Sequence, residues 1–69
     1  MKHELHDSFG DLIVVTRMPD EAPNPLDVSV KFYVGDDDEG YASHMSLSPD
    51  VARELAKALN AMADQIEKV

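Results

Sequence analysis

Carboxylates are the most concentrated chemical groups in this sequence. Residues 36–39 are four consecutive acids between two glycines, and residues 35–48 contain no lysine or arginine. Clustered carboxylate oxygens are suited either to calcium or to a cationic surface. A calcium loop of the EF-hand type requires glycine at its sixth position and glutamate at its twelfth. Counted from Asp36, those positions hold Tyr41 and Leu47, so the calcium pattern fails.

Two interpretations of this acidic turn remain open. It could be a solvated hairpin tip, or it could be an anionic surface that meets a cationic groove on another molecule. Four adjacent carboxylates repel one another, and a partner that neutralises them would explain why they are tolerated. The residues expected to bind such a partner are the acids of the turn, of the open face beside it and of the preceding loop: Asp36, Asp37, Asp38, Glu39, Asp27, Asp20 and Glu21.

Other reactive side chains do not form a recognisable catalytic or metal pattern. His3 and His6 are three residues apart, which in a strand places them on opposite faces. The serines lie in no G-x-S-x-G context. Cysteine is absent, which excludes disulfides, thiolate zinc sites and thiol catalysis. The sequence therefore predicts no metal, no cofactor and no enzymatic activity.

Composition narrows the class of partner. The 69 residues include 14 acids and 6 lysines or arginines, giving a formal net charge of −8. That balance disfavours direct binding to nucleic acid, which needs cations to displace counterions from phosphates. No signal peptide and no apolar run of membrane-spanning length is visible. We therefore expect a single domain, residues 1–69, without membrane contact, in the cytoplasm of a bacterial host.

Four segments before residue 48 have the character of strands: residues 3–8, 12–18, 26–34 and 41–47. The strongest is 26–34, where apolar and polar residues alternate without interruption. The segment 12–18 differs, because Ile13 and Val15 make its first half apolar on both faces. Either they face the same side as the helix described next, or they mark a contact with another chain.

Residues 49–67 have the pattern of one amphipathic helix. Ser48 is a good N-cap and Pro49 suits the first helical position. Apolar side chains then recur at spacings of three and four, forming one stripe of Val51, Leu55, Leu59, Met62 and Ile66. The sequence therefore predicts an α+β fold: an antiparallel three- to four-stranded meander sheet with one C-terminal α-helix packed across one face.

The stretch SLSPDVARELAKALNAMADQIE, residues 46–67, resembles the ends of many small bacterial and phage proteins. In size, charge and architecture the whole chain is similar to anti-CRISPR proteins and other phage-encoded DNA mimics. That resemblance implies an inhibitor that occupies the basic DNA-binding groove of a protein complex, with a CRISPR effector favoured as the target. The alternatives are a homo-oligomeric structural or accessory domain, such as a homodimer, and an antitoxin-like partner of a basic protein.

Overall fold

The computed structural model describes residues 1–68, so Val69, the last residue of the expected domain, lies outside the described residues. Four antiparallel strands form one sheet in the order β1-β2-β3-β4, and one helix follows. The elements are β1 (Lys2–His6), β2 (Leu12–Arg17), β3 (Val28–Tyr33), the 3-10 turn η1 (Asp38–Gly40), β4 (Tyr41–Leu47) and α1 (Pro49–Glu67). The predicted α+β fold, a meander sheet with a C-terminal helix, is confirmed.

One face of the sheet is apolar across all four strands. The register pairs Val15 of β2 with Val30 of β3, and Val30 with Met45 of β4. Ile13 lies on the same face as Val15, and both line the side toward α1. Ile13 and Val15 therefore lie on the helix-facing side of the sheet, as the first of the two explanations expects.

The opposite face of the sheet carries the most buried side chains of the described chain. Leu12 and Val14 of β2 are 5% and 7% exposed, and Ser29 of β3 is 2% exposed. Short domains bury a low fraction of their surface. Two buried apolar side chains are a very small core even for such a domain. Many of the other apolar side chains of the sheet line the space between the sheet and the helix.

A β-bulge interrupts the pairing of β3 with β4. Phe32 pairs with Ser43, whereas Tyr33 pairs with Tyr41, so Ala42 is an extra residue on β4. A bulge of this kind changes which way the flanking side chains point. Strict alternation along residues 41–47 would have placed Tyr41 on the same face as Met45. The bulge instead places Tyr41 beside Tyr33 on the opposite face.

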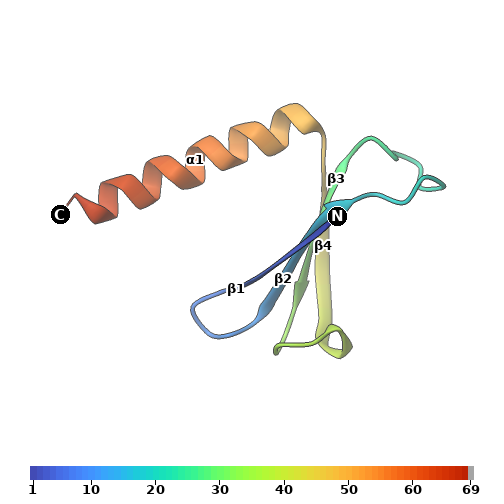
Figure 1. Ribbon diagram of the computed structural model, residues 1–69, viewed down its shortest axis with the longest axis horizontal. Helices are drawn as coiled ribbons and strands as arrows, with labels where there is room; N and C mark the ends of the chain where they lie inside the picture. Colours follow the sequence, from blue (N-terminus) through green and yellow to red (C-terminus); the bar gives the residue numbers. More distant parts are fainter. Residues whose placement is uncertain (69) are drawn as a thin grey trace.

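The helix begins as predicted, with the Ser48 hydroxyl accepting a hydrogen bond from the Val51 N–H at 3.3 Å. From this point α1 diverges from the sheet, so that the two form the arms of an open V (Figure 1). Its stripe residues remain exposed, from 36% at Leu55 to 73% at Ile66. The helix thus faces the predicted side of the sheet but does not cover it. Within residues 1–68, no helix has the length and apolar character needed to span a membrane.

Candidate functional site

The two hairpin turns of the meander lie at the same end of the sheet and are bonded to each other. The Leu12 N–H donates to the Gly35 carbonyl at 2.8 Å, and the Gly35 N–H donates to Asp11 Oδ1 at 2.8 Å. The first turn is closed by Asp7, whose Oδ1 accepts hydrogen bonds from the N–H groups of Phe9 and Asp11. Carboxylates from both turns are therefore brought together.

We call this group the acidic end, which consists of Asp7, Asp11, Asp36, Asp37, Asp38 and Glu39. All are exposed except Asp11, which is half-buried. Within residues 1–68 the ion pairs join Lys2 to Glu4, Arg53 to Asp50 and Lys57 to Glu54, so none involves the acidic end. No ion pair within residues 1–68 therefore neutralises its charge, which leaves a negative potential there.

The backbone of the second turn is closely defined. Asp37 Oδ1 accepts a hydrogen bond from the Glu39 N–H at 3.1 Å, and the Val34 N–H donates to the Gly40 carbonyl at 2.7 Å. Gly40 lies so close to Val34 that a Cβ at residue 40 would overlap the Val34 carbonyl oxygen. The turn thus presents its four acids from a closed loop rather than from an extended segment.

No family model, curated protein or solved structure matches this chain. Function must therefore be argued from the chemistry of the surfaces themselves. Within residues 1–68, no three histidine or acidic side chains are placed to hold a metal ion.

The remaining acids expected to bind a partner lie at the other end of the sheet. Asp27 precedes β3, and its Oδ2 accepts hydrogen bonds from Asn24 Nδ2 at 2.7 Å and Ser46 Oγ at 2.9 Å. Asp20 and Glu21 are exposed in the same loop. The length of β3, about 20 Å at ~3.3 Å per residue, separates this group from the acidic end. The seven predicted residues therefore form two surfaces, and Asp27 has a structural role in holding its loop.

Sequence reasoning missed Asp7 and Asp11 as members of the acidic end. The signal was present, because residues 9–11 have the composition of a turn and alternate turns of a meander fall at the same end of a sheet. Counting acids only along the chain concealed it, since residues 7–11 and 36–39 are far apart in sequence and adjacent in the fold.

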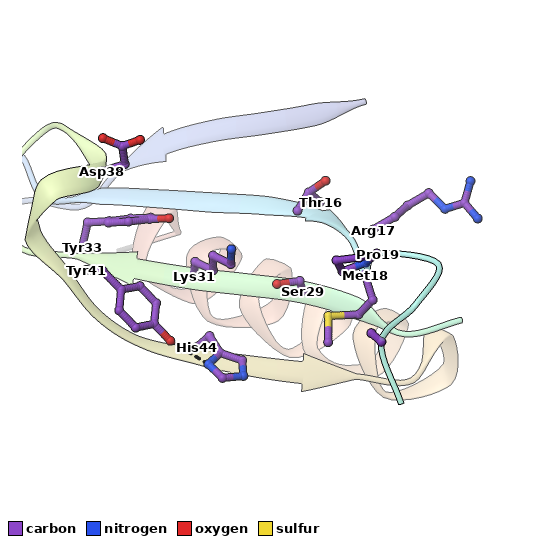
Figure 2. Close-up of a pocket in the computed structure, with 11 residues that line it drawn as sticks. Thr16, Arg17, Met18, Pro19, Ser29, Lys31, Tyr33, Asp38, Tyr41 and His44 are labelled. Atoms are coloured by element: carbon purple, nitrogen blue, oxygen red, sulfur yellow. Dashed lines mark hydrogen bonds between the residues drawn. The ribbon is translucent and has the colours of Figure 1, made fainter. Parts of the chain in front are cut away.

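A shallow depression of about 680 Å³ lies on the polar face of the sheet beside the acidic end (Figure 2). The Tyr41 hydroxyl shares a 2.7 Å hydrogen bond with His44 Nδ1, and the Tyr33 ring meets Tyr41 edge-on at 5.8 Å. The Ser29 Oγ is buried without a hydrogen-bond partner among the described residues. Because His44 is bonded to Tyr41 rather than to a serine, this arrangement provides no activated serine nucleophile.

Two lysines lie next to the acidic end on the polar face of the sheet. Lys2 and Lys31 line a second depression together with Asp36, Asp37 and Asp38. Lys31 is half-buried on β3, whereas the four acids of the turn are exposed. The outward surface of the turn is therefore the part most available to a cationic partner.

Proposed function

We propose that this protein is a non-enzymatic inhibitor that binds the basic DNA-binding groove of a nucleic-acid-handling complex through its acidic end. The observation that supports the proposal is the convergence of six carboxylates from two separate turns, without an ion-pair partner in residues 1–68. A groove lined with lysine and arginine binds DNA through its phosphates. Carboxylates held at the end of a sheet can compete for the same cations.

The spacing of the two turns suits this competition. The first hairpin and the second are centred two strands apart, or about 10 Å at ~4.8 Å per strand. The acidic end thus extends its charge over a surface rather than concentrating it at a point. Long-range attraction between this surface and a basic groove would speed association, and salt would weaken it.

The acidic charge of the chain supports a target with a basic binding surface. The resemblance to anti-CRISPR proteins supports a narrower class of target. A CRISPR effector in the cytoplasm of a bacterial host is the complex that the similarity to anti-CRISPR proteins favours. An antitoxin-like role, in which the acidic end binds a basic toxin, relies on the same electrostatic chemistry. The identity of the captured protein distinguishes these two roles.

The test combines capture with a charge-matched control. Tagged protein is used to capture partners from bacterial lysate at low and high salt, and DNA is then added as a competitor. We expect the variant D36N/D37N/D38N/E39Q to lose the partner, because it removes four of the six carboxylates. The control D50N/E54Q/D64N/E67Q changes net charge by the same amount on the helix, away from both groups of acids expected to bind, and should retain binding.

Three results would contradict the proposal. Undiminished binding by the D36N/D37N/D38N/E39Q variant would show that the acidic end is not the contact. Equal losses in both variants would show that only net charge matters. Recovery of no other protein under any salt condition would favour a structural or accessory domain instead.

A further inference from the structure

An open apolar groove runs between the sheet and α1. Its lining comes from all four strands and from residues 52–59 of the helix, and includes Ile13, Val30, Phe32, Ala52, Ala56 and Leu59. The groove has a volume of about 500 Å³. Surfaces of this character are normally the interior of a domain, so the groove indicates a missing occupant.

The surface area of the chain indicates how large that occupant is. The chain exposes 5547 Å². A folded monomer of this mass is expected to expose about 4,300 Å². The excess, about 1,200 Å², is larger than the ~800 Å² that each partner buries in a standard protein interface and falls in the range of obligate dimers.

The helical stripe continues beyond the groove that its own chain provides. Leu59 is the last stripe residue to line the groove, while Met62 and Ile66 are 53% and 73% exposed. The helix is about 28 Å long at ~1.5 Å per residue, whereas the strands of six residues span only about 20 Å. A small apolar ligand in the groove would leave Met62 and Ile66 in water, and a second protein surface would not.

Charge does not prevent a second copy from occupying the groove. The chain has a net charge of −8, so two copies repel each other over most of their surfaces. The groove is the exception, because no residue that lines it is charged. The acidic end lies at the turns, outside the lining. A second copy can therefore approach along the groove without bringing carboxylates into contact.

We propose that two copies of this chain interlock reciprocally, with the stripe of each α1 occupying the apolar groove of the other. The arrangement is isologous, since each copy provides the same helix and the same groove. Leu59, Met62 and Ile66 of one copy fill the groove of the second. Ala52 and Ala56 line the groove with small side chains and so allow the two helices to approach closely. Both acidic ends remain outside the interface.

Sedimentation and light scattering of the purified full chain provide the first test. We expect twice the mass of the chain, and a change to the monomer mass in L59E. The adjacent variant N60E adds the same charge beside the stripe on the same helix, and should remain a dimer. The D36N/D37N/D38N/E39Q variant should also remain a dimer, which separates this proposal from the function of the acidic end.

A second measurement covers the case in which L59E fails to fold. A dimer mixed from isotope-labelled and unlabelled wild-type chains should show intermolecular nuclear Overhauser effects between the Met62 methyl group and the Phe32 ring. A folded wild-type monomer would overturn the proposal, as would a wild-type chain that folds only with another protein. A dimer without contacts between one copy's helix and the other's groove would overturn it as well.

Discussion

The loss of stability caused by Leu59→Ala should be much larger in an interlocked dimer than in a monomer. Leu59 is 62% exposed in the single chain. Full burial of a leucine contributes about 1.5–3 kcal/mol, so Leu59→Ala should cost an isolated chain less than about 1 kcal/mol. If Leu59 is buried in the partner's groove, the same change should cost about 2–5 kcal/mol per chain. The pair would lose at least about 4 kcal/mol, of which less than about 2 kcal/mol is also lost by two separate chains, so association should weaken by at least about 2 kcal/mol, or roughly thirtyfold.

Urea unfolding followed by circular dichroism measures this difference. The wild-type midpoint should rise between about 5 and 500 µM protein, because mass action stabilises an associated native state. Leu59→Ala should lower the midpoint strongly at both concentrations. Leu26→Ala is the matched control, since Leu26 is 79% exposed and does not line the groove. Midpoints independent of concentration, together with equal small effects of both substitutions, would refute the reasoning.

Three further predictions concern the elements that position these surfaces. Ser48→Ala should destabilise the fold by about 1 kcal/mol in thermal unfolding, because the Val51 N–H loses its cap; no change would contradict the capping role. Gly40→Ala should cost more than about 3 kcal/mol in urea unfolding, because its Cβ would overlap the Val34 carbonyl. Gly10→Ala has open space around it and should cost only the ~1–2 kcal/mol of its φ of +87°; equal costs would contradict the assigned overlap. Asp11→Ala should raise the amide exchange rate of Gly35, whose N–H donates to that carboxylate, and unchanged protection would contradict this bond.

The fold could be predicted where local chemistry decides it. Ser48 and Pro49 define the start of α1, and the glycines around the acidic turn define the start of β4, so both elements have the predicted bounds. The expected strand at 26–34 is shorter in the structure, because Leu26 lies in the loop that Asp27 holds to Ser46. Local composition favoured a longer strand, and the contact that shortens it joins residues far apart in sequence.

The remaining features depend on contacts between distant residues or between molecules, which a pattern along the sequence does not identify. An apolar stripe predicts that α1 packs against an apolar surface, but it does not say which molecule provides that surface. The acidic end could be predicted only in part, because the meander adds Asp7 and Asp11 to the turn and places Asp27 at the far end. The bulge at Ala42 is a further example, since one extra residue changes the face on which Tyr41 lies.

The position of α1 after the sheet has a consequence for synthesis of the chain on the ribosome. At about 5–20 residues per second, the 19 residues of α1 take roughly 1–4 s to translate after β4. During that interval the apolar face of the sheet lacks even the partial lining that residues 52–59 of α1 provide in the finished chain. The segment already made contains ten of the 14 acids and three of the six basic residues. Neighbouring chains on one polysome therefore repel each other during the seconds when they are most prone to aggregate.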